Sequence, residues 1–121
     1  MKHCLLVDDS SVVRKVARHI LEAMSFSVSE AENGREALAQ CRSHMPDAVL
    51  LDSDMPEMDG IDFLAALRKQ EGGQRPKVVY VTSENDVDRI TRAISAGASA
   101  YLMKPFDRDT LVERFHQIGL V

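Results

Sequence analysis

Short apolar segments alternate with longer segments of helical periodicity from one end of the chain to the other. Four of these short segments are continuous apolar runs, which are typical of strands buried inside a parallel sheet. A fifth, at residues 26–29, alternates apolar and polar side chains and indicates a half-exposed edge strand. We therefore predict strands at residues 4–7, 26–29, 48–51, 78–81 and 100–103.

The segments between these strands carry apolar residues three or four positions apart, which is the spacing of one helix face. The first helix begins near Ser11, and its apolar face would hold Val12, Val13, Val16, Ala17, Ile20, Leu21 and Met24. Helix boundaries also have clear signals. Asn33 with Glu36 resembles a capping box, Asp59 can cap a third helix, and Gly97 is suited to end a fourth. Leu111, Val112, Phe115 and Ile118 would form the inward face of the last helix.

Strands that alternate with helices along the whole chain predict an α/β fold. The expected architecture is a single doubly wound parallel sheet of five strands with right-handed crossovers. A length of 121 residues suits one domain, which we place at residues 1–121.

Composition excludes several classes of protein. There are 15 basic and 19 acidic residues, and the net charge of -4 argues against generic nucleic-acid binding, which uses a basic surface. No stretch reaches the roughly 20 apolar residues of a membrane helix, and the N-terminal residues lack the apolar core of a signal peptide. We expect a cytoplasmic protein without membrane insertion. Cys4 and Cys41 lie in apolar patterns and are expected to be buried.

The chemically active residues follow the predicted strands directly. Asp8 and Asp9 follow the first strand, Asp52 the third, Thr82 the fourth and Lys104 the fifth. Each could have an ordinary role alone, as a helix cap, a strand end or a solvated lysine. Parallel α/β sheets, however, bind ligands beyond the carboxyl ends of their strands. We therefore expect these side chains to converge in one cleft.

Three carboxylates in one cleft repel each other, and a hard cation such as Mg²⁺, which prefers oxygen ligands, would relieve that repulsion. The cation would also allow a phosphoryl group to approach an acidic site. Asp52 could then act as a nucleophile and form an aspartyl-phosphate. Lys104 and Thr82 could bind phosphoryl oxygens, through an ammonium and a hydroxyl respectively.

This constellation resembles the receiver domain of two-component response regulators. The matching motifs lie in the same order over nearly the whole chain. They are Leu6-Val7-Asp8-Asp9-Ser10, Leu51-Asp52-Ser53-Asp54-Met55-Pro56-Glu57-Met58-Asp59-Gly60, Val81-Thr82-Ser83-Glu84, Gly97-Ala98-Ser99-Ala100-Tyr101 and Lys104-Pro105-Phe106. The resemblance implies the flavodoxin-like strand order 2-1-3-4-5 and a cis peptide bond between Lys104 and Pro105.

The resemblance also implies the roles of the site residues. Mg²⁺ would be held by Asp9, Asp52 and the backbone carbonyl of Asp54, with Asp8 acting partly through water. Thr82 and Tyr101 would act as switch residues that respond to phosphorylation of Asp52. The change would be read on the surface made by the fourth helix, the fifth strand and the last helix.

In the receiver family a histidine kinase donates the phosphoryl group and a downstream protein reads it. The chain would then be a phosphoacceptor switch, without enzymatic activity beyond its own phosphorylation and dephosphorylation, and we expect a monomer. Two jobs remain open. One is a chemotaxis-type messenger, and the other is a phosphorelay intermediate or a regulator of another partner.

One acidic residue, Asp54, occupies a position where many members of the receiver family carry Asn or another residue. Asp54 adds a charge beside the acceptor, and Glu84 adds another at the rim of the site. We expect both to modulate how water or a partner reaches the phosphoryl group.

Two other protein classes share features with this chain. Asp52-Ser53-Asp54 resembles the first motif of haloacid-dehalogenase phosphatases, but that family carries its acidic pair last in the chain and uses a cap domain. A flavodoxin-like FMN carrier shares the expected topology, but Asp8 and Asp9 would repel its phosphate.

Overall fold

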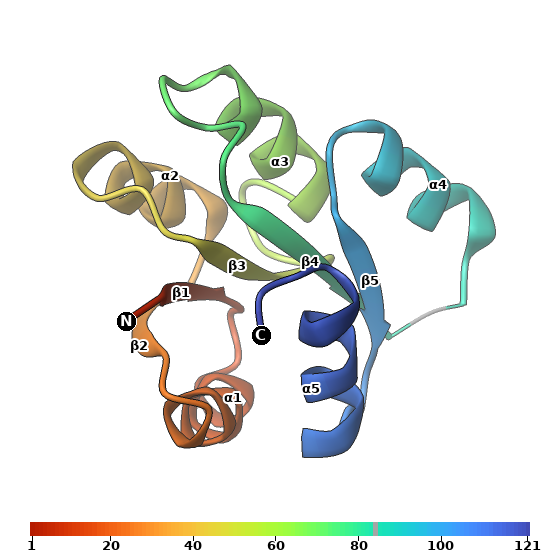
Figure 1. Ribbon diagram of the computed structural model, residues 1–121. Coiled ribbons are helices and arrows are strands. Elements are labelled where there is room, and N and C mark those ends of the chain that lie inside the picture. Colours follow the sequence, from red (N-terminus) through yellow and green to blue (C-terminus); the bar gives the residue numbers. More distant parts are fainter. Residues whose placement is uncertain (84) are drawn as a thin grey trace.

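The central strands are apolar along their length because helices cover both faces of the sheet (Figure 1). The computed structural model describes residues 1–83 and 85–121, and in this part of the chain five parallel strands alternate with five helices. The strands are β1 (His3–Val7), β2 (Ser27–Ala31), β3 (Ala48–Asp52), β4 (Lys77–Thr82) and β5 (Ala100–Met103). The helices are α1 (Ser11–Ala23), α2 (Gly34–Ser43), α3 (Gly60–Lys69), α4 (Val87–Ser95) and α5 (Arg108–Gln117).

The strand order is β2-β1-β3-β4-β5, which confirms the predicted doubly wound sheet. Helices α2, α3 and α4 lie on one face, and α1 and α5 lie on the other (Figure 1). Alternate residues of one strand therefore enter different cores: Leu5 packs with α2 and α3, whereas Leu6 packs with α1 and α5. Cys4 and Cys41 are both buried, as predicted. None of the helices in the described residues is long and apolar enough to cross a membrane.

Side-chain caps fix where the helices begin. The side chain of Asn33 accepts a hydrogen bond from the Glu36 N–H at 2.8 Å, and that of Asp59 accepts one from the Asp62 N–H at 2.9 Å. Both caps were predicted. The first helix is capped by Ser10, whose hydroxyl accepts from the Val13 N–H at 3.2 Å. Asp8 and Asp9 are thus not needed as the N-cap.

Two predictions from periodicity need correction. Val12 and Val16 were expected on the buried face of α1, but they are 70% and 52% exposed. The apolar residues of this helix extend around about half of its circumference, and packing buries only the side that carries Ala17 and Leu21. Strand β2 begins at Ser27 rather than Phe26, because the Phe26 N–H donates to the Leu21 carbonyl of α1 at 3.0 Å, and pairing with β1 starts at Ser27.

Close packing of α3 against β3 depends on Gly60. A Cβ atom at Gly60 would lie 2.8 Å from the backbone oxygen of Asp52 and 3.0 Å from a ring carbon of Tyr80. The N–H of Gly60 also donates to the Ser53 carbonyl at 3.2 Å. The absence of a side chain therefore lets the start of α3 approach the end of β3, where the site residues lie.

We expect Gly60→Ala to lower the free energy of unfolding by about 1–3 kcal/mol, because a backbone oxygen cannot move aside. Urea unfolding followed by circular dichroism measures this. Gly34→Ala is the matched control, since it also changes the first residue of a helix but meets only the flexible side chain of Met58. Equal effects of the two substitutions would contradict this account of Gly60.

Candidate functional site

The register of the sheet brings the predicted site residues to one edge. Val7 pairs with Leu51, Asp52 with Val81, and Thr82 with Met103. Asp8 and Lys104 each follow the last residue of their strand. The carboxyl ends of β1, β3, β4 and β5 therefore meet at one place, as the sequence predicted.

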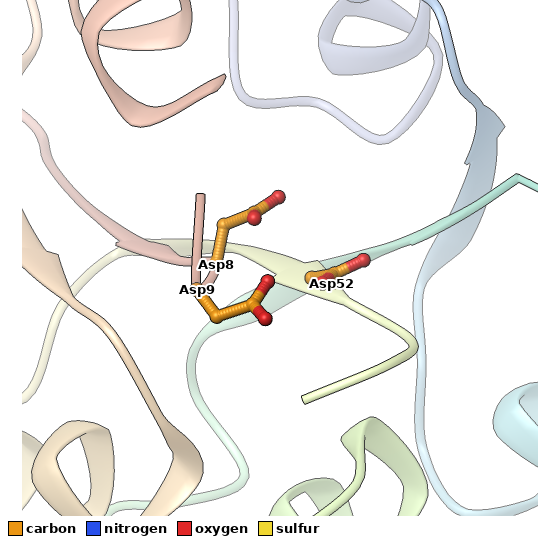
Figure 2. Close-up of side chains that lie close together, drawn as sticks. All are labelled: Asp8, Asp9 and Asp52. Carbon is orange, nitrogen blue, oxygen red and sulfur yellow. The ribbon is translucent and has the colours of Figure 1, made fainter. Parts of the chain in front are cut away.

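Asp8, Asp9 and Asp52 form a cluster at this edge (Figure 2). One carboxylate oxygen from each lies within 4.8 Å of the others. Asp8 and Asp52 are each 6% exposed, whereas Asp9 is exposed to solvent. The cluster thus has two carboxylates inside the protein and one at its entrance.

Asp8 is held in place by its own backbone and side-chain contacts. Its N–H donates to the Ala31 carbonyl at 3.1 Å, and its carboxylate accepts from the Ser10 N–H at 2.9 Å. A guanidinium nitrogen of Arg14 donates to the Asp8 carbonyl at 2.6 Å, and another binds Glu30 at 2.8 Å. Arg14 was not among the predicted site residues, although its position six residues after Asp8 places it one helical turn into α1.

Lys104 supplies the positive charge of the site. Its ammonium lies 2.9 Å from a carboxylate oxygen of Asp8 and 3.1 Å from one of Asp52. Burial alone would lower the pKa of Lys104, but the hydrogen bonds to Asp8 and Asp52 outweigh burial and raise it. Lys104 therefore stays charged and bridges two strands that are not adjacent to its own. The following peptide bond, Lys104–Pro105, is cis, as the resemblance implied.

Burial and the nearby carboxylate of Asp8 raise the pKa of Asp52. Lys104 and a backbone hydrogen bond from Asp54 oppose that rise without cancelling it. Charge at Asp52 is therefore only partly compensated by the protein itself. A cation that binds carboxylate oxygens would compensate the rest.

The donor set fits a hard divalent cation. Carboxylate oxygens are the ligands that Mg²⁺ prefers, and an exposed position beside Asp9 suits an ion that retains several waters. Asp8, Asp9 and Asp52 are the side chains that could hold it.

The two predicted switch residues lie in different environments. Thr82 is buried at the end of β4, and its carbonyl accepts from the Lys104 N–H at 2.8 Å. Tyr101 is 39% exposed, on the strand that follows α4. The guanidinium of Arg114 lies 5.8 Å from its ring centroid and donates to its carbonyl at 2.9 Å. Tyr101 is thus on the outer surface near α5, where it was expected.

The two rim acids have different outcomes. Asp54 does not stand alone, because its carboxylate forms an ion pair with Arg89 of α4 at 2.6 Å. Arg89 was not predicted as a site residue. A charged residue on a helix gives no indication in the sequence of a contact with a residue 35 positions away. Glu84 lies outside the described residues.

Comparisons with known proteins agree with this geometry. The model of the response regulator receiver domain family matches residues 4–116. The chain is 33% identical to chemotaxis protein CheY of Halobacterium salinarum over 117 residues, which cover 97% of this chain and 96% of that protein. It is 36% identical to chemotaxis protein CheY of Pseudomonas aeruginosa over 115 residues, with coverages of 94% and 93%. The solved structure of chemotaxis protein CheY4 from Vibrio cholerae superposes with a TM-score of 0.93 at 31% identity, and 98% of each chain is covered.

The raised pKa of Asp52 has a consequence for stability. Its protonated form favours the fold, and this contribution is lost as the pH rises through the raised pKa. We expect Asp52→Asn to raise the free energy of unfolding at pH 7 by about 1 kcal/mol in buffer with a chelator. The gain should shrink toward pH 3, where the wild-type carboxyl is protonated, and should also shrink when Mg²⁺ is added.

Urea unfolding at several pH values measures this difference. Glu71→Gln removes the same charge at an exposed turn and serves as the control. A less stable Asp52→Asn variant at pH 7 would show that Lys104 compensates Asp52 fully.

Proposed function

The chain belongs to the response regulator receiver family, and we propose that it accepts a phosphoryl group on Asp52 in a Mg²⁺-dependent reaction and thereby switches the binding of a partner. The observation that carries the proposal is the Lys104 ammonium between Asp8 and Asp52. A cation of the protein beside a buried carboxylate at the carboxyl edge of the sheet is what an incoming phosphoryl group requires.

The reaction is a displacement at phosphorus. A carboxylate oxygen of Asp52 forms a bond to the phosphorus as the bond to the donor breaks, and the donor leaves with that bonding electron pair. The Lys104 ammonium, which contacts the Asp52 carboxylate before the reaction, would then bind one oxygen of the transferred phosphoryl group. The Thr82 hydroxyl donates to a second oxygen. Asp9, Asp52 and the Asp54 carbonyl, with Asp8 acting partly through water, would hold Mg²⁺, which would supply positive charge for the phosphoryl oxygens.

We propose a histidine kinase as the donor, so that the broken bond is the N–P bond of a phosphohistidine. Asp52 is buried and Asp9 is exposed at the entrance of the site, so the donor would approach the acceptor past Asp9. In this proposal the phosphoryl group stays on Asp52 as the signal and is not passed on to form a released product. The chain would therefore act as a switch and not as an enzyme that turns over a substrate.

Chemotaxis is the pathway we favour, because two relatives of nearly the same length are named chemotaxis proteins. The output surface would be α4, β5 and α5. A role as phosphorelay intermediate is the second candidate.

The acceptor assignment is tested with acetyl phosphate and Mg²⁺. We expect the intact mass of the protein to increase by one phosphoryl group, and the increase to be absent from Asp52→Asn and from samples with excess chelator. Asp59→Asn is a suitable control, since Asp59 caps α3 and does not belong to the acidic cluster. Equal labelling of wild type and Asp52→Asn would refute the assignment.

Switching at the surface can be followed through Tyr101. The chain has two tyrosines and no tryptophan, and Tyr80 is fully buried. Tyrosine fluorescence quenched by acrylamide therefore reports mainly on Tyr101. We expect beryllofluoride with Mg²⁺ to reduce this quenching about twofold or more as the ring turns inward, an estimate that follows from a two-state shift in population.

The Tyr101→Phe variant is the control for this experiment, since its remaining tyrosine should not respond. Unchanged quenching in wild type, together with saturated beryllofluoride binding, would mean that Tyr101 does not report the phosphorylated state.

A further inference from the structure

Among the residues that the structure describes, Arg89 connects the loop after β3 to α4. Arg89 lies in the first turn of α4, and one of its guanidinium nitrogens contacts two groups of the loop. It donates to the Asp54 carboxylate at 2.6 Å and to the Ser53 carbonyl at 3.3 Å. The Arg89 side chain is 24% exposed and that of Asp54 is 58% exposed. The contact thus spans 35 residues of sequence, from the acceptor loop to a helix on one face of the sheet.

Ser53 and Asp54 matter because they directly follow the acceptor. Ser53 is itself fixed by two backbone hydrogen bonds, from its N–H to the Val81 carbonyl at 2.8 Å and from the Gly60 N–H to its carbonyl at 3.2 Å. Arg89 extends this anchoring by one residue, to Asp54. The backbone of Asp54 carries the N–H that acts on Asp52 and the carbonyl that would complete the cation site.

We propose that Arg89 is a positioning residue: it holds Asp54 so that the backbone of this residue is ready for the cation, and it links cation binding to the position of α4. The proposal rests on the proposed function, because it concerns the same Mg²⁺ site. It also follows that the linkage acts in both directions, since a coupling between two positions is reciprocal.

A positioning role and a general contribution to stability predict different effects of replacing Arg89 on the melting temperature and on the Mg²⁺ affinity. Ion pairs exposed to this degree contribute little to global stability. Loss of Arg89 should therefore leave the melting temperature nearly unchanged. The affinity for Mg²⁺ should change more than the melting temperature. Without Arg89 the loop at Asp54 has more conformational freedom, and ordering it when the ion binds costs free energy.

The positive charge of Arg89 and its positioning role predict opposite changes in Mg²⁺ affinity when Arg89 is replaced, so the experiment can distinguish them. Arg89 is a positive group near the cation site, so its removal without any change in the loop would tighten Mg²⁺ binding. Loss of positioning weakens binding. We expect the dissociation constant for Mg²⁺ to increase roughly threefold to tenfold in Arg89→Gln, at the low end of the effect of groups that orient metal ligands, because Arg89 acts through a half-exposed side chain.

The experiment is a Mg²⁺ titration followed by backbone amide shifts of the intact protein, in a double-mutant cycle. The four proteins are wild type, Arg89→Gln, Asp54→Asn and the double variant. If Arg89 acts through Asp54, its substitution should have little effect in the Asp54→Asn background. Arg92→Gln removes the same charge from an exposed position on the same helix and should leave Mg²⁺ affinity unchanged.

The amide shifts also test the link to α4. In wild type we expect Mg²⁺ to shift residues of the first turn of α4, and in Arg89→Gln we expect those shifts to be lost while the shifts of Asp9 and Asp52 remain. Tighter or unchanged binding in Arg89→Gln, or the same effect of this substitution in both backgrounds, would overturn the proposal and leave the proposed function intact. If wild type itself showed no Mg²⁺-dependent shifts at Asp9 and Asp52, the cation site of the proposed function would be wrong, and the role of Arg89 would be wrong with it.

Discussion

The contact of the Lys104 ammonium with both Asp8 and Asp52 is the interaction on which the site depends. A doubly wound sheet brings the ends of its strands to one edge, and in this chain three of the residues there are carboxylates. Two of them are buried, and their mutual repulsion would disfavour the fold. Lys104, which directly follows the edge strand β5, offsets part of this cost. The remaining imbalance is what a bound cation would compensate in the function that we propose.

The elements around the acceptor, β3 and α3, are closely packed, whereas α4 on the proposed output surface is packed less closely. Strand β3 is buried along its whole length, and α3 approaches it closely at Gly60. Helix α4 is different, because Ala93 is its only fully buried residue among those described and Val87 and Ile94 are largely exposed. A helix that buries little surface can shift at low cost. The Arg89 contact to Asp54 joins these two regions.

Much of the fold and most of the site could be predicted from local patterns. The doubly wound parallel sheet, the cap residues Asn33 and Asp59, and the convergence of Asp8, Asp9, Asp52, Thr82 and Lys104 follow from periodicity, capping chemistry and the geometry of parallel sheets. The strand order 2-1-3-4-5 was implied by the resemblance to receiver domains. Burial was predicted less well. Val12 and Val16 belong to an apolar stripe but are exposed, because periodicity gives the direction of a helix face and not the width of the surface that covers it.

The sequence by itself determined the class of fold and the residues available for chemistry, because both depend on short-range order: side-chain alternation, helix caps, and polar residues at the ends of apolar runs. Only the tertiary structure decided how the charges are paired. Arg89 meets Asp54 across 35 residues, Arg14 meets the Asp8 carbonyl, and Lys104 contacts two acids on other strands. Long, flexible, charged side chains can reach many partners, and the partner is fixed only when the packing of strands and helices sets the distances between them.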